Sequence, residues 1–140
     1  MKLLVFADTH GASNRMLDVV YKERDAEAVF FLGDGVRDVD ELQEAVPRLA
    51  LYRVRGNCDF AGLDPLEGLA PFGGFRIFYT HGHNYNVKYS LDTLWRAAKR
   101  SGADVAMFGH THTAHYEQRG GIHLFNPGSL SFPRSGPASY

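Results

Sequence analysis

The chain has 140 residues, 44% of them hydrophobic and 22% charged, and a formal net charge of −1. These values are typical of a soluble globular protein, and we expect residues 1–140 to form a single domain. They exclude a strongly basic surface for nonspecific binding of nucleic acid or anionic membranes. No apolar stretch approaches the ~20 residues of a membrane-spanning helix.

Cysteine usage and the N-terminus predict the compartment. Cys58 is the single cysteine, which rules out an intramolecular disulfide and is typical of a reducing compartment. Met1-Lys2-Leu3 leads directly into an apolar run that we expect to be a core strand rather than a signal peptide. We therefore expect a cytoplasmic protein.

The first half of the chain alternates short apolar runs with amphipathic stretches. Strands are predicted at residues 3–7, 28–32 and 49–54, because these runs are short and rich in strand-forming residues. We expect the first helix to begin at a Ser13 N-cap and the second to stop before Pro47. This β-α-β-α-β order predicts a parallel sheet with crossover helices.

The second half predicts more strands and one helix. Residues 60–71 contain Gly62, Pro65 and Gly68 and end at Pro71, so we expect a loop with at most a short edge strand. Residues 135–140 are expected to fray. The remaining predicted elements are strands at 75–79, 104–108, 115–119 and 122–125, hairpin turns at Gly73-Gly74 and Gly120-Gly121, and a helix through Leu91, Leu94, Trp95 and Ala98. Together these elements predict a mixed sheet, or two packed sheets, with flanking helices.

Polar residues that can bind metals follow the predicted strands. They are Asp8 and His10 after 3–7, Asp34 after 28–32, Asn57 after 49–54, His81 after 75–79, and His110 and His112 after 104–108. Side chains at i and i+2 of an extended segment point the same way, so His110 and His112 can converge. The sequence therefore predicts a site assembled at one edge of a sheet.

The donor set favours a pair of metal ions. Seven oxygen and imidazole donors are too many for one ion, and Asp34 is the natural carboxylate to bridge two. Two divalent ions bring about four positive charges against two from Asp8 and Asp34, which suits a bridging hydroxide and an anionic substrate. Such ions can activate water and clamp both oxygens of an in-line phosphoryl displacement. Imidazole ligands favour manganese, our first expectation, or iron, zinc, cobalt or nickel, over magnesium and calcium.

Five motifs, each after a predicted strand, resemble those of the calcineurin-like metallophosphoesterases, specifically their small single-domain bacterial and archaeal phosphodiesterases. They are Asp8-Thr9-His10, Gly33-Asp34, Gly56-Asn57 with Asp59, His81-Gly82-His83 and Gly109-His110-Thr111-His112. The resemblance implies an α/β fold, namely a four-layer α/β/β/α sandwich with two mixed β-sheets. It also implies a metal-dependent phosphoesterase, above all a phosphodiesterase, acting on a small-molecule or nucleotide phosphoester.

The resemblance further implies how the ligands are divided between the ions. One ion would be held by Asp8, His10, Asp34 and His112, and the other by Asp34, Asn57, His81 and His110. In many family members the residue after the asparagine is a histidine that protonates the leaving group and is paired with the next acidic residue. Here that position is Cys58, although Asp59 is kept. The identity of the general acid is therefore open.

Three residues are candidates for contacting the substrate. His83 could face the site as the acid or as a substrate contact, or could only hydrogen-bond a loop. Cys58 is expected to fill space beside the metals, and Arg134 is either a phosphate contact or a surface charge. Asp38 and Asp40 are expected to be solvated residues near a helix N-terminus.

Two other functions are compatible with the same fold. The retromer subunit of eukaryotes resembles it, has lost some ligands and serves as a protein-interaction scaffold. A phosphomonoesterase or protein phosphatase would use the same metals. All seven ligand positions carry coordinating residues here, which favours an enzyme because buried carboxylates without a metal are costly. A homo-oligomer stays open.

Overall fold

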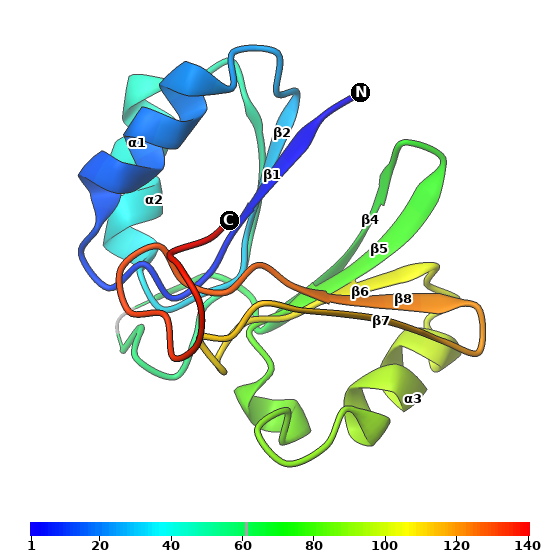
Figure 1. The fold of residues 1–140 in the computed structure, drawn as a ribbon. Coiled ribbons are helices and arrows are strands. Elements are labelled where there is room, and N and C mark those ends of the chain that lie inside the picture. Colours follow the sequence, from blue (N-terminus) through cyan, green and yellow to red (C-terminus); the bar gives the residue numbers. More distant parts are fainter. Residues whose placement is uncertain (61) are drawn as a thin grey trace.

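Three parallel strands form the smaller of two β-sheets in the computed structural model, which describes residues 1–60 and 62–140 (Figure 1). Their order is β1 (Leu3–Phe6), β2 (Ala28–Phe31) and β3 (Ala50–Arg53). All of β2 is buried, because it lies in the middle of the sheet and both faces of the sheet are covered. The carboxyl ends of these strands consequently lie side by side at one edge.

The larger sheet is mixed and has the order β4-β5-β6-β8-β7. Its inner strands β5, β6 and β8 are parallel, while β4 and β7 pair antiparallel with β5 and β8 through hairpins. Gly73 and Gly74 turn the first hairpin with φ of 64° and 83°, the left-handed backbone that a two-residue turn of this kind needs. The strands are β4 (Glu67–Phe72), β5 (Phe75–Thr80), β6 (Val105–Met107), β7 (His115–Arg119) and β8 (Ile122–Asn126).

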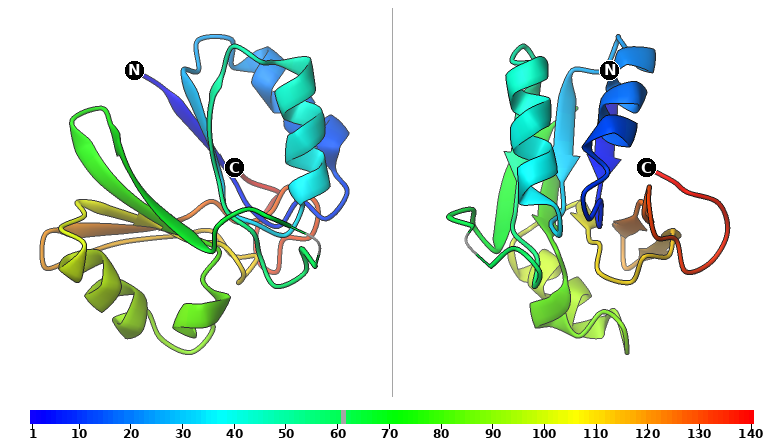
Figure 2. Two further views of the ribbon diagram at one scale, coloured as in Figure 1. Left: turned by 180° about the vertical axis from the view of Figure 1, so that it is seen from behind. Right: turned by 90° about the vertical axis from the view of Figure 1, so that its left-hand side faces the viewer.

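Helices cover the outer face of each sheet, and the inner faces pack against each other (Figure 2). α1 (Ser13–Lys22) and α2 (Val36–Ala45) lie on the smaller sheet, while the 3-10 helix η1 (His83–Tyr85) and α3 (Asp92–Arg100) lie on the larger. This arrangement confirms the predicted α/β/β/α sandwich. The prediction of two mixed sheets is wrong for the smaller sheet, whose strands are all parallel because each is joined to the next through a crossover helix. No helix within residues 1–60 and 62–140 has the length and apolar character needed to cross a bilayer.

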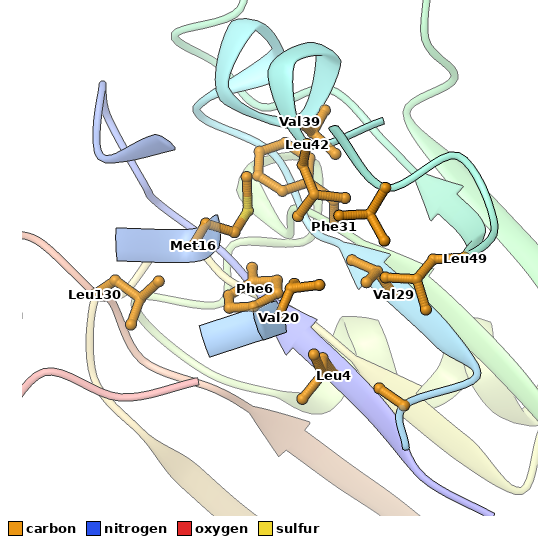
Figure 3. Packing of buried hydrophobic residues seen from close by; sticks show 12 residues of the cluster. Leu4, Phe6, Met16, Val20, Val29, Phe31, Val39, Leu42, Leu49 and Leu130 are labelled. Carbon is orange, nitrogen blue, oxygen red and sulfur yellow. The ribbon is translucent and has the colours of Figure 1, made fainter. Parts of the chain in front are cut away.

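Buried side chains fill the space between successive layers. Successive side chains of a strand point to opposite faces, so Phe6 packs beneath α1 and α2 (Figure 3), whereas Val5 packs between the two sheets. Leu94 of α3 packs against Phe78 and Phe108 on the other side of the larger sheet. Each sheet is thus held on both faces, which fixes the strand ends that carry the predicted site.

Three predictions about loops and ends were wrong in detail. Ser13 begins α1 instead of capping it, because the Met16 N–H already donates to the Ala12 carbonyl (3.2 Å). Residues 67–72 form a full strand, since Pro71 lies on an edge where the missing N–H is tolerated. Residues 135–140 return to the protein: the Ser139 N–H donates to the Ser129 carbonyl (3.1 Å).

Candidate metal centre

The loops that follow β1, β2, β3, β5 and β6 meet at one end of the two sheets. The Asp8 N–H donates to the Gly33 carbonyl (3.0 Å) and the Gly109 N–H to the His81 carbonyl (3.0 Å), joining loops from different strands. These loops bring together all seven side chains that the sequence predicted as ligands: Asp8, His10, Asp34, Asn57, His81, His110 and His112.

Left-handed backbone carries most of this cluster. The residues with positive φ are Asp8 (53°), His10 (43°), Asp34 (59°), His110 (70°) and His112 (57°). Each such non-glycine residue costs about 1–2 kcal/mol, and strain of this kind collects at functional sites. The sequence argument placed His110 and His112 on an extended segment, and this premise is wrong. Because β6 ends at Met107, His110 and His112 lie in a loop rather than on an extended strand.

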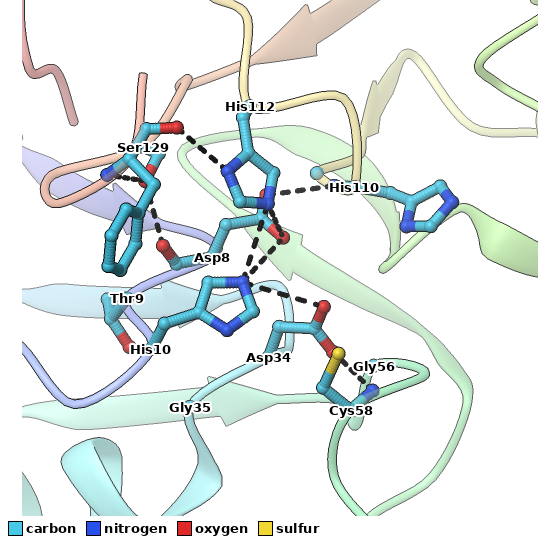
Figure 4. A network of polar contacts seen from close by, with 12 residues as sticks. Asp8, Thr9, His10, Asp34, Gly35, Gly56, Cys58, His110, His112 and Ser129 are labelled. Atoms are coloured by element: carbon cyan, nitrogen blue, oxygen red, sulfur yellow. Dashed lines mark hydrogen bonds and ion pairs between the residues drawn. The ribbon is translucent and has the colours of Figure 1, made fainter. Parts of the chain in front are cut away.

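Asp8, His10 and His112 form the first group, with Asp34 at its border (Figure 4). The Nε2 atom of His112 lies 3.4 Å from Asp8 Oδ1 and 3.4 Å from the Nε2 atom of His10. The Nε2 atom of His10 lies 3.8 Å from Asp34 Oδ2.

His81 is the centre of the second group. Its Nε2 atom lies 3.0 Å from Asn57 Oδ1, 3.2 Å from His110 Nδ1 and 3.3 Å from Asp34 Oδ2. Asp34 Oδ2 therefore borders both groups, where the sequence predicted a bridging carboxylate. His81 Nε2 also lies 3.8 Å from Asp8 Oδ1, so the two groups adjoin. The division of ligands that the resemblance implies stays a prediction.

The spacing and burial of these atoms fit divalent transition ions. Ligands about 2.1 Å from one ion, at tetrahedral or octahedral angles, lie about 3.0–3.4 Å from one another, as most of these donors do. Asp8 is 0% exposed, and its Oδ1 atom has no hydrogen-bond partner within residues 1–60 and 62–140. A buried carboxylate oxygen without a partner is costly, and a cation bound there would supply what this atom lacks.

Two of the histidines are oriented from behind by carbonyl groups. His81 Nδ1 lies 2.7 Å from the Leu32 carbonyl oxygen, and His112 Nδ1 lies 2.8 Å from that of Phe132. A carbonyl oxygen only accepts, so each Nδ1 carries the proton and each Nε2 presents its lone pair to the cluster. This is the tautomer that binds a metal ion.

Electrostatic interactions give the histidines different pKa values. Burial lowers the pKa of His81, but its hydrogen bond with Asp34 and the charges of Asp8 and Asp34 raise it overall. The neighbouring Asp8 carboxylate, 3.4 Å from its Nε2 atom, raises the pKa of His112. Burial and the charge of His81 lower the pKa of His110 to about 4. Burial raises the pKa of Asp34, yet its interactions with His81 hold it well below the usual range.

Cys58 lies at the border of the first group. It is exposed, and its backbone N–H donates to Asp34 Oδ1 (2.8 Å). Its sulfur, His10 and Asp34 offer atoms within 4.8 Å of one another. Burial and the negative charge of Asp34 raise the pKa of the Cys58 thiol.

The other predicted site residues have different surroundings. The His83 ring lies 5.4 Å from that of His81, beside the second group. The Arg134 N–H donates to the His112 carbonyl (3.0 Å), next to the first group. The carboxylate of Asp59 faces backbone N–H groups instead of the cluster.

Asp38 was predicted to be solvated, and this is wrong. It is 5% exposed and accepts hydrogen bonds from the Thr9 hydroxyl (2.6 Å) and the Gly11 N–H (2.9 Å), on either side of His10. The signal was present in the sequence, because Asp38 lies four residues before Leu42 on the apolar face of α2. Asp40 does face solvent and pairs with Arg53.

The sequence argument assigned no role to Ser129. Its hydroxyl donates to the Asp8 carbonyl (2.8 Å) and accepts from the Phe132 N–H (3.0 Å), and the residue is fully buried. The segment after β8 thus supports both Asp8 and the carbonyl that orients His112.

Comparison with known proteins places the whole chain in one family. Residues 1–140 match the Calcineurin-like phosphoesterase superfamily domain. The probable metallophosphoesterase YsnB of Bacillus subtilis is 36% identical over 136 residues, covering 96% of this chain and 78% of its own. Phosphodiesterase YfcE of Escherichia coli is 34% identical over 168 residues, covering 100% of this chain and 85% of its own.

Solved structures share the fold. A predicted phosphoesterase from Streptococcus pneumoniae TIGR4 has a TM-score of 0.83 and 30% identity, with 95% of this chain and 75% of that chain covered. A single mutant of Vps29 from Entamoeba histolytica has a TM-score of 0.77 and 26% identity, covering 94% of this chain and 76% of its own.

These comparisons confirm the resemblance seen in the five motifs. The family implies divalent metal ions and phosphoester hydrolysis, and the structure has candidate clusters of ligands for such ions. The chain belongs to the calcineurin-like phosphoesterase superfamily.

Proposed function

We propose that this protein is a phosphodiesterase that uses two divalent transition-metal ions. The convergence of seven donor side chains around the buried Oδ1 atom of Asp8 carries the proposal, because that atom lacks a partner in the described part of the chain. The name of the E. coli relative, phosphodiesterase, supports the choice of diesters.

The two groups of donors would each hold one ion. Asp8, His10 and His112 would bind the first and Asn57, His81 and His110 the second, with Asp34 bridging. The preponderance of imidazole supports transition ions over magnesium and calcium. We propose manganese, with nickel, iron, zinc or cobalt as substitutes. When bound, the ions would supply the Lewis acidity that activates water and offsets the charge of the phosphoryl group.

Cationic side chains lie close enough to the centre for their charge to act on its histidines. The charge of Lys88 contributes to the lowered pKa of His110, and that of Arg55 to the lowered pKa of His83. The charge of Arg134 opposes the raised pKa of His112. We propose Arg134 as a phosphate contact on this ground.

Two hollows adjoin the centre and meet at Asp59 and Phe60. One, of about 720 Å³, is lined by residues of the first group and by Cys58; the other, of about 370 Å³, is lined by Asn57 and His83. A phosphodiester carries an organic group on each of two phosphate oxygens, and the two hollows offer room for both. A monoester has one such group, so this arrangement supports diesters.

We propose His83 as the proton donor to the leaving group. It lines the second hollow, and its Nδ1 atom is buried without a hydrogen-bond partner among the described residues. Burial and the charge of His81 lower the pKa of His83, which favours its neutral form. The negative charge of a bound substrate would raise that pKa and favour the protonated form. In this proposal Cys58 is a small residue that lies beside the substrate and does not donate the proton.

A panel of phosphoesters tests the function. The protein reconstituted with manganese should hydrolyse bis(nitrophenyl) phosphate faster than nitrophenyl phosphate, and chelation should abolish both activities. Asp8→Asn should abolish them as well, because it removes one of two anionic ligands. A preference for monoesters would support the phosphomonoesterase alternative. Two bound ions without any hydrolysis would support the scaffold.

The likeness to Vps29 favours the scaffold alternative only weakly. It concerns the fold, and all seven ligand positions of this chain carry coordinating side chains. The single domain, the cytoplasmic location and a homo-oligomer stay predictions of the sequence.

A further inference from the structure

We propose that Asp59 is a positioning residue that fixes the backbone carrying Asp34 and Asn57, and so sets the affinity for metal. It would not serve to orient a proton donor at position 58. The inference rests on the metal centre proposed above.

The contacts of Asp59 are with main-chain donors. Its Oδ2 atom accepts hydrogen bonds from the N–H groups of Asp34 (2.7 Å) and Gly56 (2.8 Å). Its Oδ1 atom accepts from those of Gly35 (3.0 Å) and Val36 (3.1 Å). In the described part of the chain no histidine hydrogen-bonds this carboxylate, so its acceptor capacity is used by the backbone.

One consequence concerns the start of α2. The helix begins at Val36, and Gly35 at its N-cap position has no side chain with which to cap the exposed N–H groups. Asp59 supplies that cap from the loop after β3. A carboxylate at a helix N-terminus is also favoured by the helix dipole. The turn between β2 and α2 is thereby held in place.

A second consequence concerns Asp34 itself. Its φ of 59° is strained, and such a conformation persists only when the surroundings determine it. Asp59 holds its N–H, while the Cys58 N–H donates to its Oδ1 atom (2.8 Å), which leaves Oδ2 for the cluster. Main chain and side chain of the bridging residue are thus both held by residues 58–59.

Third, Asp59 connects the two loops that carry Asp34 and Asn57. Oδ2 of Asp59 joins the N–H of Asp34, after β2, to that of Gly56, after β3. Asn57 follows Gly56 within the turn that the Asp59 N–H closes on the Gly56 carbonyl (3.3 Å). Asp59 thus helps to fix the position of Asn57 relative to Asp34, together with the hydrogen bond from the Cys58 N–H to Asp34.

Calorimetric titration of the metal-free full chain with MnCl2 tests the proposal. Asp59→Asn and Asp59→Ala should bind manganese about 10–100-fold more weakly than the wild type, the usual effect of losing a residue that supports metal ligands. Asp64→Asn is the matched control: it removes the same charge from the same loop, where Asp64 pairs with Arg53 (2.9 Å). It should change the affinity less than twofold.

Rates at saturating manganese separate positioning from acid catalysis. A positioning role predicts that hydrolysis of nitrophenyl and alkyl diesters falls by the same factor in Asp59→Asn. Wild-type manganese affinity in folded Asp59→Asn, or a loss confined to alkyl esters, would overturn the inference. Should Asp59→Ala fail to fold, Asp59→Asn carries the test alone. The titration measures binding and does not require hydrolysis. A wild-type protein that binds two ions but hydrolyses no phosphoester would therefore refute the proposed function, while the titration would still test the role of Asp59.

Discussion

Asp38, buried in the first turn of α2, holds the loop that carries His10. Its carboxylate accepts from Thr9 and Gly11, and the strained residue between them points into the cluster. Like Asp59, Asp38 accepts hydrogen bonds from backbone or hydroxyl groups. It thereby holds a neighbouring candidate metal ligand in position without being a ligand itself. The centre therefore depends on residues outside the set of donors.

Removing the Asp38 carboxylate should destabilise the metal-free protein. Asp38→Ala leaves a buried hydroxyl and an N–H without their acceptor, which costs about 1–3 kcal/mol of unfolding free energy. Asp40→Ala, which loses an exposed ion pair with Arg53, should cost about 0–1 kcal/mol. Urea denaturation of the three proteins measures both values. Equal losses in the two variants would contradict the role of Asp38.

His83 should matter according to the leaving group. An alkoxide needs a proton as it departs, and a positioned acid is worth about 10²–10⁴-fold, whereas nitrophenolate hardly needs one. We expect His83→Ala to slow hydrolysis of alkyl diesters by that factor and to leave bis(nitrophenyl) phosphate within about tenfold. His115→Ala, at an exposed histidine paired with Glu117, is the control. An equal effect of His83→Ala on the hydrolysis of both esters would show that His83 is not the proton donor.

Sequence reasoning at this scale located the donors but not what holds them. The seven donors stand out because each follows an apolar run, a pattern visible in one dimension. The partners of Asp59 and Ser129 are backbone groups of distant segments, and no residue type marks a backbone donor. Cys58 likewise shows the loss of a histidine without showing which residue replaces it.

At the scale of elements, close approach between loops restricts the residues that fit. A Cβ atom on Gly56 would lie 2.7 Å from the Asp34 nitrogen and closer still to Asp34 Oδ1. Gly56→Ala should therefore displace the bridging carboxylate and weaken manganese binding by about tenfold or more. Gly62→Ala in the same loop is the control, because its nearest neighbours lie at an ordinary 3.5 Å. Titration of both variants with MnCl2 measures their affinities for manganese. An unchanged affinity in Gly56→Ala would contradict this packing argument.

The strands and their parallel order were predictable because hydrophobic runs and crossover helices are local signals. The convergence of His110 and His112 was predicted for the wrong reason, since left-handed backbone in a loop directs them to different groups. The division into two sheets depends on pairing between β6 and β8, which are separated in sequence by β7. The pattern of residues alone therefore left one sheet or two undecided, and the prediction of two sheets came from the family resemblance.

At the scale of the whole molecule, protons and metal ions compete for the same centre. The pKa values of His81 and His112 are raised, so an entering ion must displace protons, and affinity falls as pH decreases through those values. The lowered pKa of Asp34 keeps it ionised throughout. The apparent Kd for manganese should increase ~10-fold per pH unit for each proton displaced, as the pH falls below the raised pKa values of these two histidines. Calorimetry in buffers of different ionisation enthalpy measures this, and a pH-independent Kd would contradict it.

The most direct test of a two-metal centre is a crystal structure of the manganese-loaded protein with anomalous scattering from the metal. We expect two anomalous peaks per chain, both bonded to Asp34. One should contact Asp8, His10 and His112, and the other Asn57, His81 and His110. A single peak in crystals grown with excess manganese, or two peaks that do not share Asp34, would contradict the account.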